Sequence, residues 1–308
     1  MNHFRTFVIC LILCSPFQLD AQLSFGKEFD TLMDRANDLY EEKDYKAAGL
    51  LYDEALALKN GNYPLTGYYK DGIKAWARAG NMDKAYLYLF KLLEKGWITQ
   101  DELTQSETLK LLKGDARWQE ALQRINRKNQ RYGAETATLI DIWHKDQTLR
   151  RLMACAEEKF QSDSVSMGYF WQMMNVQDSL NLVTVEAIID KYGWLGANKI
   201  GDQANRTLWL VIQHCNQVKV QQKYLPLIKA SVLKGETPAS KYAFLVDRIA
   251  VNLGEPQVYG TQICTDRETG QKQVCPITDP ENVDERRKEV GFEPLQEYLE
   301  FFGADFKS

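Results

Sequence analysis

Apolar positions recur at intervals of three and four residues from residue 28 to residue 61. This is the period of an α-helix with one buried face. The pattern predicts a helix, a turn and a second helix, with alanines where two helices have to approach closely. A second pair with the same rhythm follows in residues 68–97, and a further helical unit follows in "LLKGDARWQEALQRI". We therefore expect stacked helical hairpins.

The order of small and aromatic residues in these hairpins resembles the tetratricopeptide repeat. The first hairpin carries the pattern at Ala36, Leu39, Tyr40, Tyr45, Ala48, Tyr52 and Ala55. In the second hairpin Trp76, Ala85 and Leu89 take the corresponding places, although Ile73 and Leu92 stand where small residues are usual. The resemblance implies a short array over residues 28–126. Such an array either spaces other parts of the protein or docks a protein or peptide on a concave surface.

A second predicted region, residues 134–303, continues the helical series. Helical periodicity runs from Ala134 to about Phe160, and a short helix is expected from Thr184 to a stop at Gly193. Residues 208–212 are apolar in succession, which indicates a helix that is buried on every face. One more helix is expected within residues 283–303.

The pattern becomes extended after Pro256 and predicts a β-hairpin over residues 257–277. In a regular strand, alternation would send Tyr259 to one face and Gln262 to the other. Gly260 in the middle of this strand indicates that another backbone, ring or ligand approaches closely there. We expect this stretch to line a pocket.

The cysteines beyond the first segment give one expected pair. A two-residue turn at residues 269–270 would place Cys264 directly opposite Cys275, at a separation that a disulfide accepts. Two opposed thiols without a bond are the alternative. Cys155 and Cys215 lie in apolar helical patterns and are expected to be small core residues.

The expected fold class is mainly α: a short tetratricopeptide-like helical-hairpin array followed by an α-rich domain with a C-terminal β-hairpin. A chain of 308 residues with 44% hydrophobic content can bury the cores of two such modules. The net charge of -4 offers no basic surface for phosphate backbones, so we expect no nucleic acid partner. Because CxxC, HExxH, Walker-type and GxSxG patterns are absent from the sequence, we also expect no metal and no cofactor.

The first 21 residues have the pattern of a secretory signal peptide. Arg5 precedes an apolar run from Phe7 to Leu13, and a polar slope leads to Ala21, after which cleavage is expected. A lipid anchor at Cys14 is the alternative, although Leu13 stands where a small residue is expected. No later apolar run is long enough to span a membrane, so we expect an exported protein, periplasmic or extracellular.

His214 ends the apolar helix and is the first candidate for chemistry. A buried imidazole needs partners for both ring nitrogens, so a polar group is expected beside it. Asp247 and Arg248 are neighbours on a later helix, where at least one of the two charges lies near the apolar boundary and needs a partner. Asp247 could orient His214 as a general acid or base, while a histidine with purely structural partners is the alternative.

Asp146 and Arg150 stand four residues apart on a predicted helix, where a solvated ion pair would explain them. Together with "KYGW", "LVDRIAV" and above all "QVYGTQ", this pattern resembles an uncharacterised domain of bacterial proteins that often follows tetratricopeptide-like repeats. The resemblance runs from about residue 134 to residue 302, and the family has no assigned activity. It implies motif positions at Asp146, Gln147, Arg150, His214, Asp247, Arg248, Gln257, Tyr259 and Gln262. Asn216 is an amide where the family often carries a carboxylate, which weakens any scheme with an acid at this position.

Three functions are compatible with the sequence. The preferred hypothesis is an exported repeat protein with a partner-docking array and a second domain that binds a small polar or peptide-like ligand. The ligand would lie among Asp146, Gln147, Arg150, Arg248, Gln257, Tyr259 and Gln262. The first alternative is an enzyme, a hydrolase among the options, in which His214 and Asp247 are catalytic. The second alternative is a purely structural or scaffolding protein.

Overall fold

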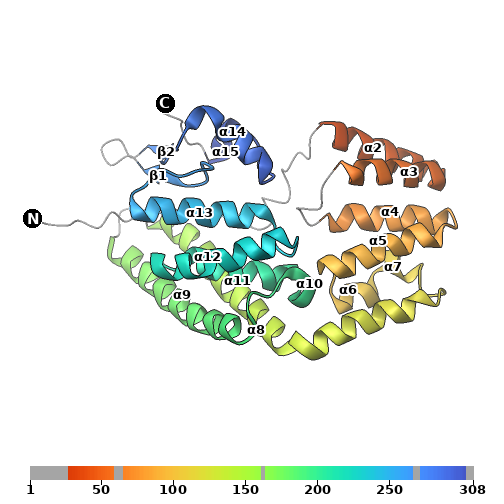
Figure 1. Ribbon diagram of the computed structural model, residues 1–308, viewed down its shortest axis with the longest axis horizontal. Helices are drawn as coiled ribbons and strands as arrows, with labels where there is room; N and C mark the ends of the chain where they lie inside the picture. The colour runs from red at the N-terminus through yellow and green to blue at the C-terminus, as the bar shows by residue number, and fades with distance from the viewer. Residues whose placement is uncertain (1–26, 59–64, 161–163, 266–270, 303–308) are drawn as a thin grey trace, which may run out of the picture. The chain divides into compact units, whose positions relative to one another are not determined.

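The computed structural model describes residues 27–58, 65–160, 164–265 and 271–302 (Figure 1). The predicted signal peptide and the predicted turn at residues 269–270 lie outside the described residues. Within these ranges the chain is mainly helical and has a two-stranded antiparallel sheet near its end, which confirms the expected fold class. None of the helices that the structure describes has the length and apolar content needed to cross a bilayer.

The described elements follow one another as a helical series that the short sheet interrupts late in the chain. In order they are α2 (Lys27–Glu41), α3 (Tyr45–Ala57), α4 (Thr66–Arg78), α5 (Met82–Lys95), α6 (Gln100–Gln105), α7 (Glu107–Lys110), α8 (Arg117–Lys159), α9 (Ser164–Tyr192), α10 (Ala197–Ile200), α11 (Asp202–His214), α12 (Val218–Leu233), α13 (Ala239–Leu253), β1 (Ile263–Thr265), β2 (Lys272–Val274), η1 (Pro280–Asn282), α14 (Val283–Glu289) and α15 (Leu295–Phe302).

The described residues form two compact units. The first unit comprises residues 27–144 and 195–207, and the second unit comprises residues 145–194 and 208–302. Helices α8 and α11 each contribute residues to both units. The polar stretch at residues 126–133, after which the second region was expected to begin, is helical and lies inside α8. It lacks proline, and Arg127, Lys128, Gln130 and Arg131 are good helix formers, so the helix continues through Gly133.

In the first unit, α2 to α5 pack as two successive helical hairpins (Figure 1). Small residues let the helices approach. A Cβ at Gly49 would lie 2.7 Å from the Trp76 ring, and one at Gly72 would lie 2.7 Å from the Tyr88 ring. The alanines at the positions expected between helices have no exposed surface: Ala36, Ala48, Ala55 and Ala85. The helical-hairpin array predicted from the sequence is therefore present.

A carboxylate on α3 links the two hairpins. Asp53 accepts hydrogen bonds from Nε1 of Trp76 on α4, at 2.9 Å, and from Nζ of Lys84 on α5, at 2.8 Å. The hydroxyl of Tyr88 donates to the same carboxylate. Burial raises the pKa of Tyr88, and the hydrogen bond to Asp53 raises it further, so this hydroxyl keeps its proton. Three helices thus share one acceptor.

The end of α5 packs against α10 through a backbone contact. Gly96 follows α5 in the left-handed conformation, with φ of 69°, and its carbonyl accepts from the amide of Asp202 at 3.0 Å. A Cβ at Gly96 would lie 1.8 Å from the carbonyl oxygen of Ala197. Only glycine fits, because the conformation and the space both exclude a side chain.

Helix α9 corrects the sequence prediction for residues 164–192. Thr184 was expected to begin a separate short helix, but α9 runs unbroken from Ser164 to Tyr192. Thr184 does not cap a helix; its hydroxyl donates to the Leu180 carbonyl one turn earlier, a bond that a threonine inside a helix can make. The expected stop at Gly193 is confirmed, since this residue adopts φ of 70° after the last helical turn.

Helix α11 contributes residues 208–214 to the second unit. Residues 208–212 are all buried, which confirms the prediction of burial on every face. Its indole and amide side chains bond to the neighbouring α13: Nε1 of Trp209 donates to the Lys241 carbonyl at 2.8 Å, and Nε2 of Gln213 donates to the Phe244 carbonyl at 3.4 Å. The fully buried Gln221 of α12 donates to the Cys215 carbonyl just after α11. These bonds satisfy polar groups that burial would otherwise leave without partners.

The predicted strand from residue 257 is wrong over its first half. Residues 263–265 pair with residues 272–274, and Gln257 makes one isolated bridge to Ile277, while residues 258–262 form an irregular loop in which Gly260 adopts φ of 71°. The expected alternation of faces therefore fails, and Thr261 and Gln262 are both buried. The close approach expected at Gly260 is found: a Cβ there would lie 2.8 Å from Cδ1 of Leu295. The approaching group is a side chain of the same unit.

The disulfide between Cys264 and Cys275 is confirmed, but the register that predicted it is wrong. Cys264 pairs with Gln273, so the strands are shifted by two residues, and the bonded cysteines are diagonal neighbours with Cα atoms 5.1 Å apart. The register follows from Gln257, whose Nε2 donates to the carbonyls of Gln262 and Cys275 at 3.0 and 2.8 Å. A turn-based prediction could not include this long-range contact.

Two further sequence expectations are corrected. Cys215 is buried as expected, but Cys155 is exposed, because it lies on the outward side of α8. The single helix expected in residues 283–303 is divided into α14 and α15 by a bend at Gly291, which adopts φ of 79°. The fully buried Arg287 closes this end of the unit by donating to the carbonyls of Glu293 and Tyr259, both at 2.7 Å.

Candidate functional site

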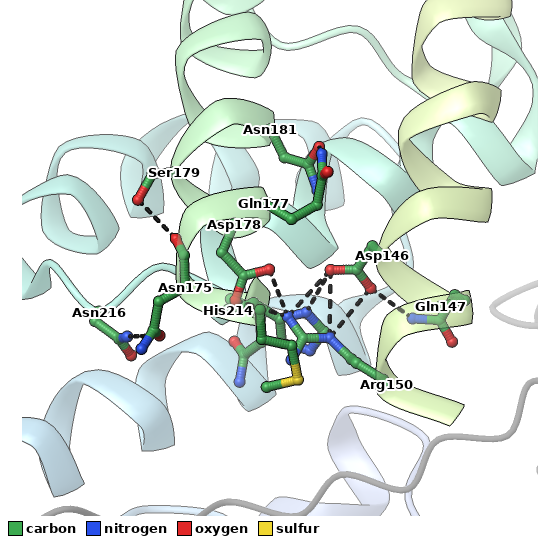
Figure 2. A network of polar contacts seen from close by, with 12 residues as sticks. Asp146, Gln147, Arg150, Asn175, Gln177, Asp178, Ser179, Asn181, His214 and Asn216 are labelled. Atoms are coloured by element: carbon green, nitrogen blue, oxygen red, sulfur yellow. Dashed lines mark hydrogen bonds and ion pairs between the residues drawn. The ribbon is translucent and has the colours of Figure 1, made fainter. Parts of the chain in front are cut away.

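Three helices of the second unit bring charged side chains to one place (Figure 2). Asp146 and Arg150 lie one turn apart on α8, so they share a face of that helix. Asp178 comes from α9, and His214 is the last residue of α11. Each helix supplies its polar group from its inner face, and the three faces meet inside the unit.

The Asp146 carboxylate is the centre of this network. Its side chain is 1% exposed, and it accepts from three groups. Nδ1 of His214 lies 3.2 Å from Oδ1, Nε2 of Gln147 donates to Oδ2 at 2.7 Å, and the Arg150 guanidinium donates through Nη2 at 3.1 Å. A solvated ion pair between Asp146 and Arg150 was expected from the sequence. The pair exists, but its carboxylate is buried, because α9 and α11 cover it.

Arg150 bridges two carboxylates. The same Nη2 atom that contacts Asp146 donates to both oxygens of Asp178, at 2.9 and 3.0 Å. Its side chain is 19% exposed and that of Asp178 is 15% exposed, so solvent reaches the edge of the network near this pair. The planar guanidinium suits such a bridge, since a lysine could not donate along these fixed directions.

The ionisation of the network follows from burial and neighbours. Burial alone would raise the pKa of Asp146, but His214 and Arg150 outweigh burial and hold that pKa below its usual range. Burial lowers the pKa of His214, and the Arg150 charge lowers it further against the opposing effect of Asp146. Burial raises the pKa of Asp178. At neutral pH the stable form therefore pairs a charged Asp146 with an uncharged His214.

The tautomer of His214 follows from this pairing. A carboxylate can only accept, so Nδ1 of the neutral ring carries the hydrogen and donates it to Asp146. Nε2 then carries the lone pair, and none of the described residues bonds to it. The His214 side chain is 8% exposed. The arrangement can accept a proton at Nε2 and return it, while Asp146 fixes the ring and stabilises the imidazolium.

Asp247 does not belong to this network. Its carboxylate has no exposed surface, and it accepts the backbone amides of Val258, Tyr259 and Thr261 at 2.7, 3.0 and 2.9 Å, as well as the hydroxyl of Thr261. The sequence indicated correctly that a charge at this boundary needs a partner. The donors come from the loop after α13, so Asp247 fixes that loop and does not orient His214.

The polar side chains of "QVYGTQ" serve the loop itself. Gln257 and Gln262 have no exposed surface, and Oε1 of Gln257 accepts the Gln262 amide at 2.8 Å. Tyr259 contributes its backbone, which donates to Asp247 and accepts from Arg287. These contacts hold together a segment without regular secondary structure. The structure thus divides the expected site residues other than Arg248 between two separate hydrogen-bond networks.

Arg248 lies near the end of α11 and belongs to neither network. It is partly buried, and its Nε is buried without a hydrogen-bond partner among the described residues. Its charge lowers the pKa of the Cys215 thiol slightly, against the larger effect of burial, which raises that pKa to about 11. Cys215 is therefore a protonated thiol at neutral pH and is not an activated nucleophile.

Asp178 is the functional candidate that the sequence prediction missed. It is the only charged residue between Ser164 and Val185. A single carboxylate in such an apolar stretch is costly to bury without a cation, and this signal could have identified it. Nearby, Nδ2 of Asn216 donates to Oδ1 of Asn175 at 3.3 Å, so the amide at position 216 connects the end of α11 to α9 (Figure 2).

No group of three metal-ligating side chains lies in position to hold a metal within the described ranges. Residues 136–306 match the model of a family of unknown function (DUF6624). The match covers most of the region that resembles an uncharacterised bacterial domain. Neither a characterised protein nor a solved structure matches the chain.

Proposed function

Because the chain belongs to this family of unknown function, we infer its activity from the geometry of the charged network and propose that the second unit contains an acid–base site for a small polar substrate. His214 acts as the general base or acid through Nε2, and Asp146 takes the orienting role that the sequence had given to Asp247. The hydrogen bond between Nδ1 of His214 and Oδ1 of Asp146, at 3.2 Å, carries the proposal.

The charges around the pair support this role. With His214 neutral, Asp146 and Asp178 carry two negative charges against the single positive charge of Arg150. A proton on His214 would make the positive and negative charges equal in number, so the network can accept a proton without creating an isolated buried charge. Arg150 keeps Asp146 ionised, which is the state that orients the ring. A reaction that removes a proton from a water molecule or a polar substrate suits this arrangement.

Direct observation of the His214 tautomer tests the proposal without a substrate. In protein labelled with ¹⁵N-histidine, the His214 ring is expected to be protonated at Nδ1 and unprotonated at Nε2 at pH 7. Asp146→Asn should redistribute the proton between the two nitrogens, because the amide can donate as well as accept. His144, which is exposed on α8, gives an internal reference.

A screen for turnover tests the function itself. Cell-envelope metabolites and peptides that raise the unfolding temperature would be incubated with the protein, and products would be followed by mass spectrometry. His214→Gln is expected to retain ligand binding and to lose turnover by at least about 100-fold. His144→Gln is the matched control and should behave as the wild type. Equal turnover by His214→Gln would exclude the acid–base role, and binding without any product would favour a ligand-binding module.

For the first unit, we propose a tetratricopeptide-like array that docks a protein or peptide. Support comes from two exposed leucines at equivalent positions of the hairpins. Leu50 follows the buried Ala48 by two residues and is 54% exposed, and Leu87 follows the buried Ala85 by two residues and is 59% exposed.

A peptide library screened against the full chain would test this docking role. Binding of a selected peptide is expected to weaken at least tenfold in Leu50→Glu and in Leu87→Glu. The matched control is Leu233→Glu, which changes an exposed leucine of α12 in the second unit. Peptides that bind all three variants equally would exclude these leucines as the docking surface.

We further propose that the protein is exported to an oxidising compartment. The disulfide between Cys264 and Cys275 supports this, because such bonds persist outside the reducing cytosol. Expression with residues 1–21 in a bacterial host is expected to give an exported chain beginning at Gln22, by intact mass. A lipid-modified Cys14 at the new amino terminus would contradict cleavage at this site, and retention in the cytosol would contradict export.

A further inference from the structure

One face of α9 carries a row of large apolar side chains that remains exposed. Tyr169 is 66% exposed, Met173 48%, Val176 55%, Leu180 59% and Val183 69%. Their spacings alternate between four and three residues, which is the seven-residue repeat of a coiled-coil seam. An exposed apolar row of this length marks an interaction surface more often than a solvated one.

The opposite face of the same helix is already occupied. Met174, Leu182 and Val185 are buried within the second unit, and Asp178 enters the network with Arg150. Helix α9 is therefore apolar on two sides, and only one of them is covered by its own unit. A helix that is apolar on every side is ordinarily buried on every side.

The row lacks charges along its margins. Asp178 is the only charged residue from Ser164 to Val185, and it faces inward. Helices that lie on membrane surfaces carry lysine or arginine beside the apolar face, and this one does not. In coiled coils, charges beside the seam select a partner of different sequence, and α9 has no such charges beside the row. Nothing along the row repels a second copy of itself.

The row is also complementary to itself. Its positions are nearly symmetric about Val176, since Tyr169 and Val183 are each seven residues away while Met173 lies three residues before it and Leu180 four residues after it. A two-fold axis at Val176 places this residue against Val176 of a second copy. The same axis brings Met173 beside Leu180 and the large Tyr169 beside the smaller Val183. The largest side chain of the row thus meets one of the smallest, which favours close packing at the two ends of the seam.

The charges at the end of α9 fit the same arrangement. Asp190, whose side chain is 63% exposed, lies one helical turn or more beyond the row. In an antiparallel pair centred on Val176, Asp190, which also lies 3.5 Å from Nζ of Lys223, comes level with a point two residues before the start of α9 in the other copy. A carboxylate is favoured there by the dipole of the helix amino terminus. In a parallel pair the Asp190 residues of the two copies would instead lie side by side.

We propose that the protein forms a two-fold symmetric dimer in which the exposed faces of two α9 helices pack antiparallel about Val176. In this dimer, the face of α9 opposite Asp178 packs against α9 of the other copy, so the interface lies away from the network with His214. It does not depend on the acid–base function, so either proposal can fail without the other.

The mass of the full chain in solution tests the dimer. Light scattering coupled to size exclusion is expected to give twice the chain mass of 35.5 kDa. Val176→Glu should give a monomer and weaken self-association at least 100-fold while keeping the helical content of the wild type by circular dichroism, because the side chain is exposed in the single chain. Leu233→Glu is the matched control, since Leu233 is 80% exposed on α12, and it should remain dimeric.

Cross-linking tests the orientation. In a Cys155→Ser background, which removes the exposed native thiol, Val176→Cys is expected to form a disulfide-linked dimer under mild oxidation. Leu180→Cys should not, unless it is mixed with Met173→Cys. Efficient self-cross-linking of Leu180→Cys would indicate parallel packing and would overturn the antiparallel arrangement. A wild-type monomer at high concentration, a dimer that survives Val176→Glu, or a monomer that binds lipid vesicles through α9 would overturn the dimer.

Discussion

Nδ1 of His214 and Oδ1 of Asp146 lie 3.2 Å apart, across a contact that joins residues 68 positions apart in the chain. The two helices that carry them meet only in the folded unit. Because the carboxylate is 1% exposed and cannot donate, the contact fixes which ring nitrogen holds the hydrogen. The proposed chemistry and the expected pH dependence of stability both follow from this bond.

The lowered pKa of His214 predicts that stability falls in mildly acidic solution. The unfolded chain takes up a proton near pH 6.5, before the folded chain does, so the contribution of His214 is present above that pH and is lost below it. The free energy of unfolding of the wild type should fall by up to about 1.4 kcal/mol per pH unit below about 6.5 from this group alone. Urea denaturation at pH 8 and pH 5.5 measures the change. His214→Gln should lose this part of the slope, while His144→Gln should keep it; equal slopes in all three proteins would contradict the prediction.

Asp247→Ala should destabilise the second unit strongly. Removing the carboxylate leaves the amides of Val258, Tyr259 and Thr261 buried without their acceptor, at a cost of about 1–3 kcal/mol for each. We expect a loss of at least about 3 kcal/mol in the free energy of unfolding, measured by urea denaturation. Glu255→Ala removes an exposed carboxylate just beyond α13 and should change stability little. A small loss in Asp247→Ala would mean that solvent reaches these amides.

Reduction of the disulfide should lower the unfolding temperature. The bond closes a loop with a sequence separation of 11, and loops of this size contribute about 3 kcal/mol by restricting the unfolded chain. Calorimetry with and without reductant measures the effect. Cys264→Ser with Cys275→Ser should be destabilised and insensitive to reductant, while Cys155→Ser should respond as the wild type does. A wild type that does not respond to reductant would exclude this stabilising role.

Gly96→Ala should destabilise the first unit more than Gly80→Ala. Both glycines have positive φ, of 69° and 76°, so both substitutions carry the cost of that conformation, about 1 kcal/mol. A Cβ at Gly80 has nothing within 4 Å, whereas one at Gly96 would meet the Ala197 carbonyl oxygen at 1.8 Å. Relieving this overlap should cost a further 1–3 kcal/mol or so. Thermal unfolding of both variants gives the comparison, and equal losses would show that α5 and α10 separate readily.

The sequence alone determined the class of fold, because helix formation depends on a local period. Apolar spacing gave the hairpins of the first unit and the buried stretch at residues 208–212. It also indicated that His214 and Asp247 need polar partners, since the cost of burying such groups is a property of the groups themselves. The disulfide was likewise predictable, because its cysteines are near each other in the chain.

Only the tertiary structure decided which partners these residues have. Asp146 rather than Asp247 meets His214, and Asp178 completes the network from a helix of which the sequence predicted only the last part. The alternation of residues 257–262 predicts a strand. In the structure, however, the buried side chains of Asp247 and Gln257 form hydrogen bonds with backbone groups of this segment, which therefore forms a loop. The contacts made by Asp247 and His214 join positions 11 to 68 residues apart. A local pattern shows that a buried charge needs a partner, but the partner is determined only when distant helices pack.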